Sequence, residues 1–194
     1  MNWYKKAQLT QTIPYFQEFE DMGDYVPNEE SLGQKLQEQF NTHIVSDIGQ
    51  GDSGVAYLLA NGDVLKITTN SQEGQVANYI LNNPSPSVIE YKAVWKEGDL
   101  YYIIMEKINE MAIDYPEIEQ QFHNLEPIID KHNAKDPLSL YNVVKRDNNI
   151  DENFKMMLLP YLFYLQKLPF KVFDFTNVNN VGVKDGKLIF FDIT

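Results

Sequence analysis

A glycine-rich turn between two strand-like segments is the feature that most limits how this chain can fold. Residues 48–57 read Ile-Gly-Gln-Gly-Asp-Ser-Gly-Val-Ala-Tyr, and the apolar run Val-Leu-Lys-Ile at 64–67 follows nearby. Glycine allows backbone N–H groups to approach a phosphate, which a side chain would prevent. Lys66, on the following strand, adds a compact positive charge. This pattern predicts antiparallel strands that enclose a phosphate-binding hairpin with Gly49, Gly51 and Gly54 at its turn.

The composition excludes several classes of protein. The chain has 194 residues, a formal charge of −12, 43% hydrophobic residues and no cysteine. This apolar content is sufficient for a packed core, and the lack of cysteine excludes disulfides and thiolate chemistry. The negative charge disfavours nonspecific binding to nucleic acid or anionic membranes. No signal-peptide core or membrane-spanning stretch is evident, so we expect a cytoplasmic protein with neither nucleic-acid nor membrane partners.

The first part of the chain predicts a helical prefix over residues 1–43. Leu32, Leu36 and Phe40 recur every four residues, which is typical of an amphipathic helix. The aromatic-rich residues before them are interrupted by Pro14. We expect these aromatic residues to pack on the body of the protein or on a partner.

Strand signals follow, over residues 44–108. The tight-turn sequences Asn-Gly-Asp at 61–63 and Glu-Gly-Asp at 97–99 separate apolar runs. The predicted strands cover 55–59, 64–67, 88–96 and 100–106. A helix is predicted over 71–82, with Ser71 as its cap and Glu73 in its first turn.

The remainder of the chain is predominantly helical in pattern. Helices are predicted over about 115–132, 137–147 and 151–168, and the last is so apolar that we expect it to be buried on all sides. Two short strands at 181–184 and 188–191 flank Asp185-Gly186, a strong hairpin signal. Oxygen-bearing side chains surround this hairpin: Asp174 and Asn179, five residues apart, precede it, and Asp192 follows its last strand.

Together these motifs resemble the protein kinase-like superfamily over about residues 44–194, especially its reduced atypical and aminoglycoside-phosphotransferase-like branches. The resemblance implies an α+β, protein kinase-like two-lobed fold. An N-lobe at 44–108 would hold a five-stranded antiparallel sheet, and a shortened, mostly helical C-lobe would cover 109–194. It also implies ATP and Mg²⁺ as cofactors and an unidentified protein or small molecule as phosphate acceptor.

The resemblance assigns roles to individual residues. The hairpin residues Gly49, Gly51 and Gly54 would cover the phosphates, and Val55 would also belong to the nucleotide-binding residues. Lys66 would contact the α and β phosphates, and Glu73 would hold Lys66 in place. The backbone of Glu106, Lys107 and Ile108 would meet the adenine. Asp174 would accept the proton of the acceptor hydroxyl, and Asp192 would bind Mg²⁺ with Asn179 or Asn180.

Departures from the family pattern leave more than one function open. Val172-Phe173 precedes Asp174 where the family has His-Arg, and Ile193-Thr194 follows Asp192 where it has Phe-Gly. Asn180 heads the family-like run Asn-Val-Gly-Val, an alignment that would put Phe175 at the position of the base. The first hypothesis is a small kinase that transfers phosphate to a hydroxyl. The alternatives are a pseudokinase used as a binding module and, less favoured, a nucleotidyl transferase.

The same residues also have purely structural interpretations. Lys66 would point to water if its strand lay at an edge of the sheet. Glu73 would simply complement the dipole of its helix. Asp174 would be an ordinary turn residue. The three histidines, His43, His123 and His132, have no metal-ligand spacing.

Overall fold

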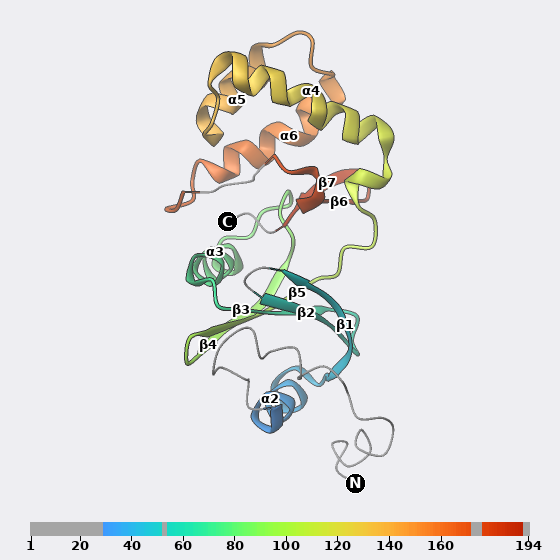
Figure 1. The fold of residues 1–194 in the computed structure, drawn as a ribbon, viewed down its shortest axis with the longest axis vertical. Helices are drawn as coiled ribbons and strands as arrows, with labels where there is room; N and C mark the ends of the chain where they lie inside the picture. The colour runs from blue at the N-terminus through green and yellow to red at the C-terminus, as the bar shows by residue number, and fades with distance from the viewer. Residues whose placement is uncertain (1–28, 52–53, 172–175, 192–194) are drawn as a thin grey trace.

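The computed structural model describes residues 29–51, 54–171 and 176–191. Within these ranges the chain forms an α+β fold with five α-helices, a five-stranded antiparallel sheet and a separate two-stranded hairpin (Figure 1). The α+β class and the five-stranded antiparallel sheet are the ones that the sequence predicts.

The five strands lie in the order β1-β2-β3-β5-β4, and all neighbouring pairs are antiparallel. Their bounds are β1 Ile44–Gly51, β2 Gly54–Leu59, β3 Val64–Thr68, β4 Tyr91–Glu97 and β5 Leu100–Met105. The chain leaves β3 through helix α3 (Ser71–Asn82) and returns through β4, so β3 lies in the centre of the sheet. Gly62 and Gly98 have φ angles of 88° and 58° in the turns of the two hairpins, a conformation that favours glycine.

Alternate residues divide the sheet into two different faces, as the period of two in a strand requires. The core face packs under helix α2 (Glu29–Phe40), where Leu32 and Leu36 meet the apolar side chains of the strands. These side chains are Val55, Tyr57, Leu59, Leu65, Ile67, Leu100, Tyr102 and Ile104. The cavity face carries Ala56, Val64, Lys66, Ile103 and Met105. Helices α2 and α3 lie on opposite sides of the sheet (Figure 1).

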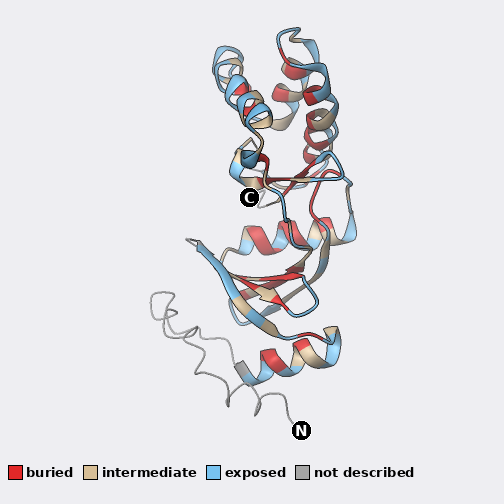
Figure 2. Cartoon of the chain, turned by 90° about the vertical axis from the view of Figure 1, so that its right-hand side faces the viewer, coloured by how far each residue is buried: buried red, intermediate tan, exposed pale blue. Residues whose placement is uncertain are grey.

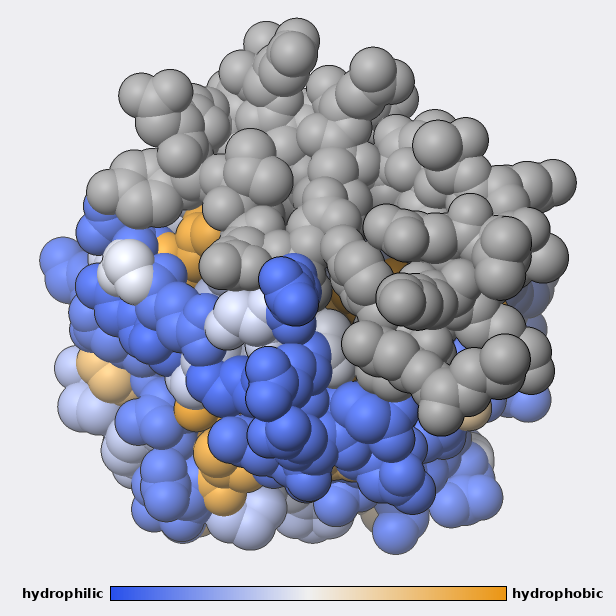
Figure 3. All heavy atoms as spheres, turned by 90° about the horizontal axis from the view of Figure 1, so that it is seen from below, coloured by the Kyte–Doolittle hydropathy of each residue, from blue (hydrophilic) through white to orange (hydrophobic). Residues whose placement is uncertain are grey.

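Helix α2 is amphipathic, as the sequence predicts. Leu32 and Leu36 are buried, whereas Glu30, Gln34 and Glu38 are exposed. Seen from the α2 end of the molecule, the visible described surface is mainly hydrophilic (Figure 3). On the core face, burial and the nearby Glu97 raise the pKa of the Tyr102 hydroxyl to about 12.

Helix α3 has the predicted range, but its N-cap lies one residue before the predicted one. Asn70, not Ser71, is the N-cap, and its side chain accepts hydrogen bonds from the backbone N–H of Gln72 and Glu73 at 3.0 and 3.3 Å. Gly74 lies against β5, and a Cβ at this position would overlap the ring of Tyr101. Glycine therefore allows the first turn of α3 to approach the sheet closely.

The hairpin of β6 (Val181–Lys184) and β7 (Lys187–Phe190) links the two halves of the molecule. Its turn, Asp185-Gly186, has φ angles of 52° and 70°, which fits the predicted two-residue turn. The N–H of Val183 donates to the carbonyl of Glu110 at 2.8 Å. At the other edge, the N–H of Ile89 donates to Phe190 at 2.9 Å. The sheet half is thus joined to the hairpin by backbone hydrogen bonds on both sides.

One of these contacts corrects a predicted strand. The sequence places Val88 in the strand before the turn at 97–99, but β4 begins only at Tyr91. Val88 instead forms a parallel bridge with Phe190. The apolar run at 88–96 therefore serves two sheets, which local periodicity does not distinguish.

Three helices complete the fold, within a few residues of their predicted ranges. They are α4 (Pro116–His132), α5 (Pro137–Arg146) and α6 (Glu152–Leu165). Tyr161 of α6 stacks on Phe190 of β7 with ring centroids 3.5 Å apart, and burial raises the pKa of Tyr161 well above its usual value. No helix in the described ranges is both long and apolar enough to cross a membrane.

The expectation that α6 is buried on all sides is wrong. Phe154, Leu158 and Leu165 are buried, but Met156 is 67% exposed and Phe163 is 49% exposed. Figure 2 shows the same division, since buried residues occupy only one side of the helices in this half. Helix α6 packs mainly against α5 and β7, and these are too few elements to surround an apolar helix.

Candidate functional site

A cavity of about 730 Å³ lies against the cavity face of the sheet. Ala56, Val64, Ile103 and Met105 supply apolar walls from three strands, and Met111, Asn179 and Phe191 line the cavity from the other half of the molecule. Its volume is within the range of small-molecule sites, which combine apolar walls with a few polar groups. The main polar groups here come from β3 and α3.

Lys66 and Glu73 form an ion pair inside this cavity, as the sequence predicts. Lys66 lies on the central strand between Ala56 and Ile103, so its interpretation as an edge-strand lysine is wrong. Glu73 is 8% exposed, and a carboxylate that is this buried needs a partner. Its position at the start of α3 complements the helix dipole as well, but the dipole alone does not explain the burial.

The glycine hairpin covers one side of the cavity. Gly51 pairs with Gly54 across β1 and β2, and residues 52–53 between them lie outside the described ranges. A Cβ on Gly54 would collide with the carbonyl oxygen of Ile67 on β3, so this glycine has a packing role. Val55 is buried and also lines the cavity.

Gly49 differs from the expectation. It lines the cavity, but its N–H donates to the side chain of Asp47 at 2.8 Å. This N–H is therefore not offered to a phosphate while Asp47 holds it. The exposed carboxylate of Asp47 also places a negative charge beside a site that the sequence predicts to bind an anion.

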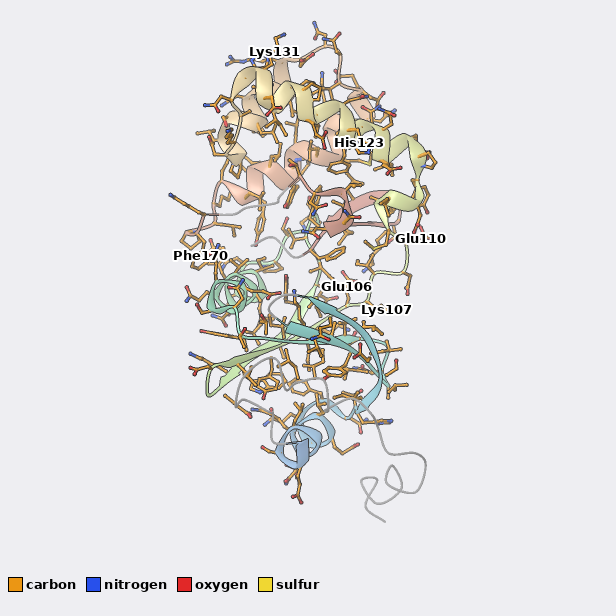
Figure 4. All side chains as sticks on the ribbon, in the orientation of Figure 1. Glu106, Lys107, Glu110, His123, Lys131 and Phe170 are labelled. Atoms are coloured by element: carbon orange, nitrogen blue, oxygen red, sulfur yellow. The ribbon has the colours of Figure 1, made fainter. Side chains whose placement is uncertain are left out.

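The segment 106–108 lines the cavity between the sheet and the hairpin, where Figure 4 labels Glu106 and Lys107. The Glu106 side chain pairs with Lys184 on β6 and also accepts the N–H of Glu90 at 3.0 Å. Hydrogen bonding to Glu106 raises the pKa of Lys184. Because the side chain of Glu106 is occupied in this way, Glu106 is suited to contact a ligand through its backbone.

Packing against β6 fixes the position of the same segment. A Cβ on Gly182 would overlap the side chain of Ile108, and Met111 forms an antiparallel bridge with Gly182. Residues 106–111, which link the sheet to the helical half, therefore run alongside the hairpin as a third, strand-like segment. This arrangement holds Lys107 and Ile108 at the cavity.

The predicted metal and acceptor residues are only partly described. Asp174 and Asp192, together with Phe175, lie outside the described residues. Asn179 lines the cavity, and its side-chain nitrogen donates to Asn177 at 3.1 Å, which leaves its carbonyl oxygen as the atom suited to a cation. Asn180 is not one of the lining residues, and its carbonyl accepts the N–H of Phe191 at 3.0 Å.

No cluster of three or more histidine or acidic side chains with metal-binding geometry occurs in the described part of the chain. His123 lies on α4 beside Glu119 and Glu126, at 3.7 and 3.9 Å, on an exposed surface. A divalent ion in the cavity would therefore depend on Asn179 and on residues beyond Phe191, together with oxygen atoms of the ligand itself.

Sequence patterns did not identify three residues that shape the site. Asn70 caps α3 and lines the cavity, and Gly74 sets the approach of α3 to the sheet. Asp47 occupies the N–H of Gly49. Only Asn70 had a local signal, since asparagine directly before a helix is a favoured cap.

Comparison with models of known protein families gave no match to this chain, and comparison with curated protein sequences gave none either. What the fold and site define is an α+β protein with a lysine–carboxylate pair in a cavity on one face of a five-stranded antiparallel sheet. The functional argument therefore rests on this geometry and on the motifs of the sequence.

Proposed function

We propose that the chain is a small kinase-like protein that binds ATP with Mg²⁺ in this cavity and transfers a phosphoryl group to a hydroxyl. The ion pair between Lys66 and Glu73 is the observation that carries the proposal. This lysine lies on a central strand, pairs with a carboxylate from the next helix and is covered by a glycine hairpin. Such an arrangement is suited to binding a polyphosphate. The strand order and the linker 106–111 along the cavity agree with a kinase-like, two-lobed arrangement.

The residues divide the work by position. Lys66 would neutralise and orient the α and β phosphates. Glu73 would hold the ammonium group of Lys66 in position through their ion pair. Ala56, Val64 and Met105 offer apolar surface for the adenine ring. Mg²⁺, when bound, would neutralise charge on the phosphates, with Asn179 and Asp192 as its candidate ligands.

In the transfer step, the acceptor oxygen would form a bond to the γ phosphorus as the bond from that phosphorus to the bridging oxygen breaks, and ADP would leave. Asp174 would take the proton of the acceptor hydroxyl. Catalysis of this type depends mainly on positioning and on neutralising charge, for which a preformed ion pair is suited.

A pseudokinase remains a second candidate, because one contact at the glycine hairpin favours it. Asp47 occupies the N–H of Gly49, and its negative charge opposes the binding of phosphate. The lack of His-Arg before Asp174 agrees with this alternative. Such a protein would keep the fold and act by presenting a surface.

Calorimetry of ATP binding, with and without Mg²⁺, tests the proposal. We expect wild-type protein to bind ATP more tightly with Mg²⁺ than without, and Asp192→Asn to lose this difference. Lys66→Met should weaken binding at least about tenfold, or about 1.4 kcal/mol. The matched control is Lys92→Met, since Lys92 also pairs with a carboxylate, Asp63 at 2.6 Å, but does not line the cavity.

The outcomes separate the candidates. Binding that depends on Lys66 and on Mg²⁺ supports the kinase-like site. Binding that depends on Lys66 but not on Mg²⁺ supports the pseudokinase. Absence of ATP binding by folded wild-type protein would overturn the proposed nucleotide site.

A further inference from the structure

An exposed apolar strip runs along helices α5 and α6, in the half of the molecule away from the sheet. We define this α5–α6 strip as Leu138 and Tyr141 of α5 with Met156 and Phe163 of α6. Leu138 is 54% exposed, Met156 67% and Phe163 49%. The rings of Tyr141 and Phe163 lie 6.3 Å apart, so the two helices contribute to one surface. Met156 and Phe163 are seven residues apart in α6 and therefore lie on the same side of that helix. Exposed apolar side chains gathered on one surface often mark an interaction site.

Lysines border the strip. The ammonium of Lys145 lies 5.6 Å from the centre of the Tyr141 ring, and that of Lys167 lies 4.4 Å from the centre of the Phe163 ring. These contacts hold positive charge directly over apolar surface. In a chain with a formal charge of −12, such a surface selects for an acidic partner.

A cavity of about 490 Å³ continues the strip at Leu138. Leu165, Leu168 and Phe170 give it apolar walls, and two further lysines, Lys135 and Lys171, line it. The carboxylate in its lining, Asp136, is occupied in capping α5, where it accepts the N–H of Leu138 and Ser139, both at 3.0 Å. The cavity thus offers space for an aromatic side chain beside positive charge.

The chain itself contains a segment with the complementary chemistry. Residues 15–24 read Tyr-Phe-Gln-Glu-Phe-Glu-Asp-Met-Gly-Asp, which gives three aromatic and four acidic residues and no lysine or arginine. We propose that residues 15–24 of a second copy of this chain bind the α5–α6 strip and its adjoining cavity. Aromatic side chains would enter the apolar surface, and the flanking carboxylates would pair with the lysines.

The distance to be spanned assigns the segment to a second copy. Asp24 lies five residues before Glu29, where α2 begins, and five residues reach at most about 18 Å. Helix α2 lies at one end of the molecule and α5 with α6 at the other, with the sheet, α3 and the hairpin between them (Figure 1). Packed layers are about 10 Å apart, so Asp24 cannot reach the strip of its own copy across the intervening layers, and the whole segment 15–24 can bind only to the strip of a second copy. The resulting contact is head-to-tail and therefore depends on concentration.

A charge-swap mixing experiment on the full chain tests the proposal without any nucleotide. One variant is Lys145→Glu with Lys167→Glu, and the other is Glu20→Lys with Asp21→Lys. In sedimentation velocity at on the order of 100 μM, wild-type protein should associate and each variant alone should be monomeric. An equimolar mixture of the variants should associate again, because each reversed segment then meets a reversed surface.

Lys96→Glu is the matched control, since Lys96 also lies over a ring, Tyr101 at 5.1 Å, but on the sheet. This variant should associate as wild type does. A monomeric wild type, or a variant mixture that stays monomeric, would overturn the proposal. These results do not depend on ATP binding, so the failure of either proposal is distinguishable from that of the other.

Zero-length carbodiimide cross-linking gives a second measurement that needs no variant. The experiment uses a mixture of unlabelled and ¹⁵N-labelled wild-type protein. We expect cross-linked peptides in which an acidic residue of segment 18–24 from one labelled form is joined to Lys145 or Lys167 from the other. Links found only within one label would assign the contact to a single copy and overturn the proposal. The absence of any such link would overturn it as well.

Discussion

The two faces of the five-stranded sheet show how one set of strands can serve two purposes. The core face is apolar and closed by α2, through Leu32 and Leu36. The cavity face has small or apolar residues around one charged group, Lys66, and leaves an open volume of about 730 Å³. Neighbouring residues such as Leu65 and Lys66 therefore have different functions, because adjacent side chains in a strand point to opposite faces.

This difference indicates where stability and binding originate. Large apolar side chains on the core face contribute by burial, at about 25 cal/mol per Å² of apolar surface. The ion pair on the cavity face contributes little net stability, since desolvation offsets most of the attraction between the charges. A charged pair retained at such a position is consistent with binding, and this contrast leads to the predictions below.

The largest effect should appear when substitutions at two adjacent residues of β3, one on each face of the sheet, are compared. Leu65→Ala should lower the free energy of unfolding by about 2–5 kcal/mol, because it leaves a void in the core face. The double variant Lys66→Met with Glu73→Gln should change it by only about 1 kcal/mol, because both charges are removed together. It should nevertheless lose ATP binding. Urea denaturation and calorimetry measure the two quantities, and an equal loss of stability in both variants would identify the ion pair as purely structural.

A smaller effect is expected where α3 approaches the sheet. Gly74→Ala should cost about 1–3 kcal/mol, because the new methyl group would overlap Tyr101. The cost should fall in a Tyr101→Ala background, where the ring is absent. Gly49→Ala is the control, since no atom lies within 4 Å of its added Cβ. Thermal or urea denaturation of the four proteins completes the double-mutant cycle, and the same cost in both backgrounds would contradict this account.

Substitution of two helix caps allows ATP binding to be compared between variants of equal stability. Asn70→Ala and Asp136→Ala should each cost about 1 kcal/mol, since each removes hydrogen bonds to the first turn of its helix. Only Asn70 lines the cavity on the sheet, so under the proposed function only that variant should weaken ATP binding. Equal ATP affinity in both variants would separate the α3 cap from the site.

The Asp136 cap should also depend on pH. Hydrogen bonds from Ser139 lower the pKa of Asp136 from its ordinary 3.8. The carboxylate therefore stabilises the fold above pH 3.8, and this contribution is lost as the pH falls below that value. Asp136→Asn should therefore be less stable than wild type above pH 3.8, and the difference in the free energy of unfolding should disappear in strong acid. Denaturation at a series of pH values measures this difference.

The smallest effect concerns the carboxylate beside the glycine hairpin. Asp47→Asn should raise ATP affinity a few-fold, because it removes a negative charge near the phosphates, and exposed charges of this kind contribute less than about 1 kcal/mol. Added salt should reduce the difference between the two proteins. Unchanged affinity in calorimetry would show that Asp47 does not face the bound ligand.

The sequence predicts much of the fold because many of its signals are local. Glycine turns at Gly62, Gly98 and Gly186 and the periodicity of apolar residues locate strands and helices within a few residues. The bridge between Val88 and Phe190 has no local signal, since it joins segments that are distant in the chain. The exposed side of α6 was missed for a similar reason, because burial depends on how many elements surround a helix.

The candidate site shows the same limit. Lys66 and Glu73 are close in sequence, and a strand followed by a helix brings them together, so their pairing is predictable. The contact of Asp47 with Gly49 occurs at an irregularity in the pairing of β1 with β2. No residue pattern predicts this irregularity. The role of Gly74 depends on the position of Tyr101 on another strand, and is visible only in the folded chain.

An NMR titration of ¹⁵N-labelled protein with ATP and Mg²⁺ tests the central claim most directly, because it reports on both faces of the sheet at once. We predict saturable shifts in the backbone amides of Ala56, Lys66 and Lys107, which line the cavity, with little change at Leu32 and Leu36 under the core face. Shifts centred on α2, or no saturable shifts at all, would contradict the assignment of the cavity face as a nucleotide site.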